Sequence, residues 1–265
     1  IIIIIKQILR SVFILDNNIY EKLSHVDCIL VSHFSSKKKL GSIEDFHFRH
    51  MHNVLLDNNC SVNYFLHNHT NISTKIIENS WNDCVIPRYV APKCVNLISE
   101  ISILIGGIRV FLHFLIQKNK ENKVFNRIKM VAALEAISHS SLNAERFARI
   151  LERFVLSVSP SYIIFTFEGH SWERILINKI KSLNKNIICI GFVHTSIFPN
   201  QHASLVNHKK ELMPDYILVP GNEIAKIFRR KISKSIPIKV IGSPKKKNQN
   251  FRLKQRQTLK VLILP

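Results

Sequence analysis

Cysteine is scarce in this sequence of 265 residues, and no two cysteines form a C-x-x-C pair. The five cysteines are Cys28, Cys60, Cys84, Cys94 and Cys189. An odd number without close spacing argues against a disulfide framework and against a cysteine-based zinc site. The pattern also indicates a reducing compartment, so we expect a cytoplasmic protein.

Glycine-rich signatures of three enzyme classes are absent as well. The sequence contains no G-x-G-x-x-G dinucleotide fingerprint, no Walker A phosphate loop and no G-x-S-x-G nucleophile elbow. These motifs bring backbone N–H groups to a phosphate or expose a nucleophilic serine, so their absence gives no support to those three chemistries. We also find no internal repeat.

Acidic residues are few: 18 Asp and Glu stand against 38 Lys and Arg, which gives a formal charge of +20. Such a charge favours anionic partners, namely nucleic acid, anionic lipid headgroups or phosphorylated substrates. The basic residues are scattered, and neither an RNP-like aromatic pattern nor a recognition helix is present, which argues against nucleic acid. Because the chain is rich in Ile, Asn and Lys, a compositional origin of part of the charge stays open.

Long uncharged apolar runs are missing too, although hydrophobic residues make up 46% of the chain. This share supports a substantial core and excludes global disorder. The most membrane-like stretch, 97–116, contains Glu100, Arg109 and His113. Spanning helices need about 20 mainly apolar residues, and a charge at the bilayer centre costs at least roughly 2.5 kcal/mol. We therefore interpret this stretch as a buried or interfacial helix.

Alternating apolar runs predict an α/β fold with a Rossmann-like parallel sheet flanked by helices. The clearest part is 162–241, with strands expected at 162–167, 186–193, 216–219 and 238–241 and helices at 171–183 and 222–231. Continuous apolar strands separated by amphipathic helices are typical of a sheet that is covered on both faces.

The earlier part of the chain fits the same fold less clearly. We expect strands at 12–15, 28–32 and 62–66, helices at 16–27, 44–56, 95–117, 122–138 and 142–157, and an irregular segment at 68–92. Residues 1–243 would then form one domain with a helical insertion at about 95–157. A polar linker at 244–258 and a first strand of another domain at 259–265 would follow. With no initiator Met, the chain is expected to be a piece of a longer protein.

Polar side chains follow two neighbouring strands of the predicted sheet. Glu168 and His170 come after the strand at 162–167, where ligands bind in open α/β sheets. An acidic group directly after a buried strand is costly unless it is used or paired. Ser171 and Glu173 begin the next helix, and capping that helix is the alternative to a binding role for them.

The next strand ends in a second polar segment, with His194, Thr195 and Ser196 followed by His202. A histidine beside a carboxylate suits general-base work or the binding of a phosphate or sugar hydroxyl. A structural histidine that ties two loops together is the alternative. Thr195 and Ser196 either donate to a phosphate or open the following turn.

Two further groups of residues give weaker signals. Gly221 and the Gly–Ser pair at 242–243 end predicted strands, where backbone can approach a ligand, but turns need glycine anyway. Several histidines gather early in the chain, at positions 47, 50, 52, 67 and 69. Their carboxylate and cysteine neighbours do not fall at a recognised ligand spacing, so the sequence predicts no metal site.

Four of these segments together resemble a known family. The turns 168–173 and 191–195 fit E-x-x-x-W-E and G-x-x-H-[ST], and 214–221 and 242–244 fit P-D-x-[IL]-x-x-x-G and G-S-P. In this order and spacing they resemble bacterial surface-carbohydrate (capsule or O-antigen) biosynthesis proteins, which are glycosyltransferases of the GT-B type. The resemblance covers about 162–244, roughly a third of the chain.

The resemblance implies two Rossmann-like domains that face each other across a cleft. This chain would be the N-terminal, acceptor-side domain, and the missing second domain would bind a nucleotide-sugar donor, with no other cofactor. The acceptor would be a glycan or a lipid-linked molecule, and the basic surface would make peripheral contact with an anionic inner membrane. A nucleotide-sugar epimerase, a glycerophosphotransferase of the same build and a non-catalytic nucleic-acid-binding domain are the alternatives.

By the same resemblance, Glu168 or His194 would be the catalytic base that deprotonates the acceptor hydroxyl. Expected substrate-binding residues are His170, Trp172, Glu173, Thr195, Ser196, His202, Gly221 and Ser243. No metal would be needed if helix N-termini and basic side chains held the leaving diphosphate.

Overall fold

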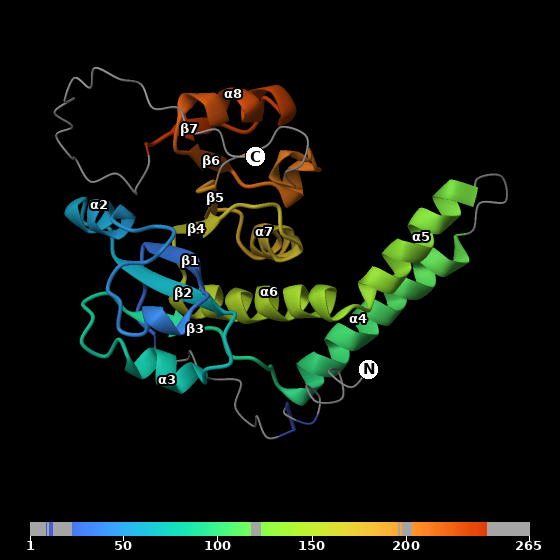
Figure 1. The fold of residues 1–265 in the computed structure, drawn as a ribbon, viewed down its shortest axis with the longest axis horizontal. Coiled ribbons are helices and arrows are strands. Elements are labelled where there is room, and N and C mark those ends of the chain that lie inside the picture. Colours follow the sequence, from blue (N-terminus) through green and yellow to red (C-terminus); the bar gives the residue numbers. More distant parts are fainter. Residues whose placement is uncertain are drawn as a thin grey trace, which may run out of the picture.

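Seven parallel strands form one sheet at the centre of the molecule (Figure 1). The computed structural model describes residues 23–117, 123–195 and 203–242, together with 9, 11, 12 and 197, and these counts refer to them. Across the sheet the strand order is β3-β2-β1-β4-β5-β6-β7. The strands are β1 (Cys28–Phe34), β2 (Val62–Asn68), β3 (Arg88–Val90), β4 (Tyr162–Thr166), β5 (Ile188–Phe192), β6 (Tyr216–Val219) and β7 (Ile238–Val240).

Helices connect the strands and cover both faces of the sheet. The α-helices are α2 (Met51–Asp57), α3 (Thr74–Asn79), α4 (Leu97–Ile116), α5 (Lys123–Ala136), α6 (His139–Val158), α7 (Ser171–Leu183) and α8 (Asn222–Lys231). Short 3-10 helices are η1 (Lys37–Lys39), η2 (Ala203–Leu205) and η3 (Lys210–Leu212). The predicted Rossmann-like α/β fold is confirmed.

Alternate residues along each strand supply two separate cores. Ile29 and Val31 of β1 belong to a core shared with α6, α7 and α8. Cys28 and Leu30 belong to a second core, on the opposite face, which includes Ile77 of α3. Because successive side chains of a strand point to opposite faces, a nearly continuous apolar run is what a sheet covered on both sides requires.

The strand order changes direction between β1 and β4. From β1 the chain builds outward to β2 and β3, and after α4, α5 and α6 it returns to β4 beside β1 and builds the other way. In open α/β sheets the crevice at such a switch point, outside the carboxyl ends of the strands, is where ligands bind. We therefore expect a ligand site at the carboxyl ends of β1 and β4.

Helices α4 and α5 form a long hairpin that projects away from the sheet (Figure 1). Its base is fixed by a buried ion pair, in which Arg146 Nε and Nη2 of α6 donate to Glu100 Oε1 and Oε2 at 2.6 and 2.8 Å. Large apolar side chains are exposed along the hairpin, seven on α4 and six on α5. Within the described residues, α4 alone is long and apolar enough to cross a membrane, and 17% of its most apolar window is buried.

The structure corrects three predictions in the early part of the chain. Residues 68–92, expected to be irregular, contain α3 and the edge strand β3. The helix expected at 44–56 begins only at Met51, because Asp45 Oδ1 accepts the backbone N–H groups of His47 and Phe48, both at 2.8 Å, and holds a turn there. The strand predicted at 12–15 lies almost wholly outside the described residues. Of the helix predicted at 16–27, residues 23–27 are described, and they are not helical. The predicted linker and final strand, 244–265, lie entirely outside them.

Two adjacent glycines of α4 offer a matched test of the hairpin packing. A Cβ atom on Gly107 would lie 2.9 Å from the carbonyl oxygen of Ala136 and 3.0 Å from Leu142 Cδ2, whereas one on Gly106 meets nothing within 4 Å. Gly107→Ala should lower the free energy of unfolding by about 1–3 kcal/mol through overpacking. Gly106→Ala should raise it by up to about 1 kcal/mol, because alanine favours the helix. Denaturant unfolding measures both, and equal stabilities would contradict the close crossing.

Candidate functional site

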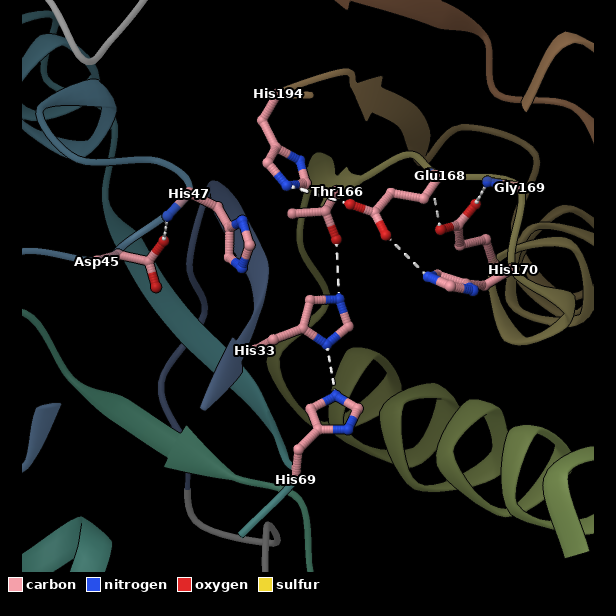
Figure 2. A network of polar contacts seen from close by, with 10 residues as sticks. His33, Asp45, His47, His69, Thr166, Glu168, Gly169, His170 and His194 are labelled. Atoms are coloured by element: carbon pink, nitrogen blue, oxygen red, sulfur yellow. Dashed lines mark hydrogen bonds and ion pairs between the residues drawn. The ribbon is translucent and has the colours of Figure 1, made fainter. Parts of the chain in front are cut away.

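Polar side chains from four neighbouring strands meet at the carboxyl edge of the sheet, at the switch point (Figure 2). His33 near the end of β1 is in register with His67 of β2, and Val31 is in register with Phe165 of β4. The register brings the residues after each strand together because all strands run the same way. Figure 2 labels His33, His69, Thr166, Glu168, His170 and His194 of this group. His67 belongs to it as well, because it is paired with His33 in the strand register.

The turn between β4 and α7 is held from inside by Glu173. Its side chain is fully buried, and its two carboxylate oxygens accept the backbone N–H groups of Glu168 at 3.0 Å and Gly169 at 2.9 Å. Burial raises the pKa of Glu173 to about 7, while these hydrogen bonds and His170 act to lower it. The sequence left open a binding role and a capping role for Glu173. In the structure its carboxylate is bonded to the backbone of the turn, so we assign it a positioning role.

Gly169 is required by the same turn. Its φ is +85°, and a Cβ atom there would lie 2.4 Å from backbone atoms of Ala203 and Ser204. Only glycine combines this left-handed conformation with so close an approach of another chain segment. The turn is therefore fixed on one side by Glu173 and on the other by η2.

Glu168 lies between two imidazole rings (Figure 2). Its Oε2 is 2.9 Å from His170 Nε2, and its Oε1 is 3.1 Å from His194 Nε2. The hydrogen bond from His170, with a smaller contribution from that of His194, holds the pKa of Glu168 well below its usual range. The hydrogen bond to Glu168 in turn raises the pKa of His170. Glu168 is therefore a carboxylate that orients both rings.

The two histidines differ in their access to a ligand. The side chain of His194 is 5% exposed, and its ring lies edge-on against that of His47, with centroids 4.3 Å apart. The side chain of His170 is 51% exposed and lines a cavity of about 360 Å³. Because Nε2 of His170 is hydrogen-bonded to Glu168, a ligand in the cavity would contact the other ring nitrogen, Nδ1.

A second group of histidines lines the same cavity. His33 Nδ1 is 2.8 Å from His69 Nε2, and His33 Nε2 is 3.0 Å from Thr166 Oγ1 (Figure 2). The ring of His67 stacks on Phe147 of α6 with centroids 4.0 Å apart. Burial, with smaller contributions from neighbouring histidines, lowers the pKa of His33 to about 2 and that of His67 to about 3. At neutral pH both rings are therefore uncharged.

Sequence reasoning missed His33. It lies near the end of an apolar strand that was predicted to end at residue 32. The signal that points to it is the His-x-His pair at 67 and 69, where the neighbouring strand ends. Residues two apart on a strand share one face of the sheet. A histidine in register on the next strand therefore joins the pair in a group of three imidazoles.

The remaining predicted residues are spread over several positions. Trp172 is 5% exposed, lines the cavity and packs edge-on against Phe147. Thr195 follows His194, and its buried Oγ1 has no hydrogen-bond partner among the described residues. Gly221 is the N-cap of α8 at the end of β6, with nothing within 4 Å of a Cβ position. Ser196, His202 and Ser243 lie outside the described residues.

Comparisons with known proteins do not indicate a function for this chain. The chain matches no protein-family model, no curated protein and no solved structure. Function must therefore be argued from the switch-point crevice and its side chains.

The Glu168–His170 pair predicts a pH-dependent contribution to stability. The pKa of Glu168 is depressed from 4.5, so its contribution is present above that pH and is lost in acid. The pKa of His170 is raised from 6.5, so its contribution is present below that pH and is lost as the pH rises. His170→Ala should therefore lower the free energy of unfolding most between these two values, by up to about 1 kcal/mol because the pair is partly exposed.

Urea unfolding of wild type and variant at about pH 5.5 and about pH 8 measures this difference. Gly106→Ala, on the projecting hairpin, changes no titratable group and is the control, so its difference in the free energy of unfolding from wild type should be the same at both pH values. An equal effect of His170→Ala at both pH values would contradict the ion pair.

Proposed function

We propose that this chain is the acceptor-side domain of a glycosyltransferase-like enzyme of surface polysaccharide biosynthesis. The enzyme transfers a sugar from a nucleotide-sugar to a glycan or lipid-linked acceptor. The observation that carries the proposal is the Glu168–His170 pair, which borders a cavity at the switch point of a Rossmann-like sheet. Its support from sequence is the resemblance of the segments around 168–173, 191–195, 214–221 and 242–244 to that family.

His170 suits the role of the base better than the two residues named from the sequence. Two imidazoles stabilise the carboxylate of Glu168, and so low a pKa makes it a weak base. His194 is almost fully buried. His170 is exposed to the cavity, and its pKa lies above the usual histidine value because Glu168 holds its Nε2. A carboxylate that orients an imidazole is a recurring arrangement for proton abstraction.

In this proposal His170 Nδ1 takes the proton of an acceptor hydroxyl as the oxygen attacks the anomeric carbon of the donor. Glu168 fixes the ring and stabilises the imidazolium that forms. His194 holds the other oxygen of Glu168 and keeps the carboxylate in place. The bond to the nucleoside diphosphate breaks in the same step, and the donor-binding domain stabilises the leaving diphosphate.

Substitutions in the natural protein test these roles with labelled nucleotide-sugars and lipid-linked saccharide acceptors. His170→Ala should reduce kcat by about 10²–10⁴-fold, which is the usual contribution of a general base. Glu168→Gln should reduce it less and should move the rising limb of the pH–rate profile to lower pH, because the carboxylate no longer raises the pKa of His170.

His25→Ala, an exposed histidine before β1, is the matched control and should transfer sugar at the wild-type rate. Wild-type kcat in His170→Ala would rule out the base. Epimerised donor or glycerophosphate in the product, instead of a new glycosidic bond, would identify one of the two rival enzymes.

The α4–α5 hairpin supports a membrane surface as a partner of the enzyme. Exposed apolar side chains such as Ile105, Ile108 and Ile128 stand beside the basic residues Arg109 and Arg127. Helices of this kind lie in the headgroup region of anionic bilayers. Contact there would bring the crevice toward acceptors carried on a phosphorylated lipid.

Vesicle binding tests the hairpin separately from catalysis. Replacing Lys123 and Arg127 of α5 together by glutamine should weaken binding to anionic vesicles about 30-fold, since each basic residue contributes about 1 kcal/mol. Replacing Arg229 and Arg230 of α8 by glutamine is the control with the same loss of charge, and it should have little effect. Equal losses in both double variants would show that only the net charge of the chain matters.

A further inference from the structure

The strand register gathers three imidazoles on one face of the sheet. His33 of β1 continues the face of Ile29 and Val31, and His67 and His69 continue the face of Phe65. All three therefore lie on the side covered by α6, just beyond the point where Phe147 packs on His67. One ring nitrogen from each of the three histidines lies within 4.8 Å of the others.

We propose that His33, His67 and His69 bind one divalent transition-metal ion of the zinc type, with a coordination position that opens into the neighbouring cavity. The donor set is made of imidazoles only, which suits zinc, copper, nickel or iron better than magnesium or calcium. Three protein ligands with an open fourth position are the pattern of catalytic zinc sites, whereas structural sites use four.

The spacing of the ligand atoms is close to what such an ion requires. Zinc–nitrogen bonds are about 2.0–2.1 Å long, so two nitrogens on one tetrahedral ion are roughly 3.3 Å apart. The observed 2.8 Å between His33 Nδ1 and His69 Nε2 has to widen by roughly half an ångström. The ligand nitrogens of the three histidines lie within 4.8 Å of one another, so any pair farther apart than about 3.3 Å has to move closer. His69 is exposed, so its ring can adjust.

Thr166 contacts the ring nitrogen of His33 that does not face the other two histidines. Its Oγ1 is 3.0 Å from His33 Nε2 and accepts the proton of that nitrogen in the proposed tautomer, so that the lone pair of Nδ1 faces the other two rings. Histidine ligands of metals usually donate their second N–H in this way, which fixes both tautomer and ring orientation. Thr166 is fully buried in β4, so the acceptor is held rigidly.

Two more observations favour a ligand at this place. The buried Nδ1 of His67 has no hydrogen-bond partner within the part of the chain that the structure describes. The cavity of about 360 Å³ that the three histidines line also reaches His170. The open coordination position would therefore take an oxygen, from water, a phosphate or a sugar hydroxyl, on the side of the cavity that His170 borders.

Metal titration of the chelator-treated protein tests the site without any turnover, so its outcome is independent of the proposed glycosyl transfer. Calorimetry with Zn²⁺ should give one ion per chain for wild type and for the surface variant His25→Ala. His69 is exposed, so His69→Ala should leave the fold intact, and it should abolish this binding. Thr166→Val, which keeps the shape but removes the acceptor, should weaken binding about 10- to 100-fold, and Thr166→Ser should preserve it.

Cobalt substitution reports the geometry of the same site. Co²⁺ in wild type should give the intense visible absorption of a four-coordinate ion, and His69→Ala should give only the weak spectrum of the hydrated ion. Equal affinity for Zn²⁺ in wild type and His69→Ala would overturn the proposal, as would a six-coordinate spectrum in wild type. Unchanged affinity in Thr166→Val would overturn the part assigned to Thr166.

Discussion

Parallel strand direction is the constraint from which the site follows. With every strand running the same way, the residues after β1, β2, β4 and β5 must emerge at one edge of the sheet. The reversal of strand order between β1 and β4 keeps the connecting helices from closing over that edge. Residues as far apart in the chain as His33 and Thr166 therefore come within hydrogen-bonding distance. No local feature of either residue would place them together.

Polar groups at such an edge are partly buried and need partners, and the structure supplies these locally. Glu168 accepts hydrogen bonds from two imidazoles, whereas Glu173 is held by backbone N–H groups of the turn before α7. Asp45 is satisfied by two backbone N–H groups and by the hydroxyl of Ser32 at 2.7 Å. The crevice thus holds its carboxylates in fixed positions within a strongly basic chain. Of these three, Glu168 alone hydrogen-bonds to a ring that lines the cavity, that of His170.

The sequence predicted most of the later sheet because its strands are continuous apolar runs between amphipathic helices. It failed at β3, three residues long at the sheet edge and partly exposed, where no period can be recognised. The proximity of Glu168 and His194 was predictable, since they follow adjacent strands. The contact of His47 with His194 was not, because it depends on the turn that Asp45 holds in a long connection. Such contacts depend on tertiary structure and leave no periodic signal.

Helix α6 is the element that connects the crevice with the projecting hairpin. In its N-terminal half, Phe147 stacks on His67, while the preceding residue, Arg146, makes the buried pair with Glu100 of α4. Adjacent residues of a helix point in different directions, so one turn of α6 contacts both sites at once. Loss of either charge would leave the other buried and unpaired, which is strongly destabilising, so α4 is held rigidly to α6. One segment of α6 therefore fixes both the base of the hairpin and the His67 wall of the cavity.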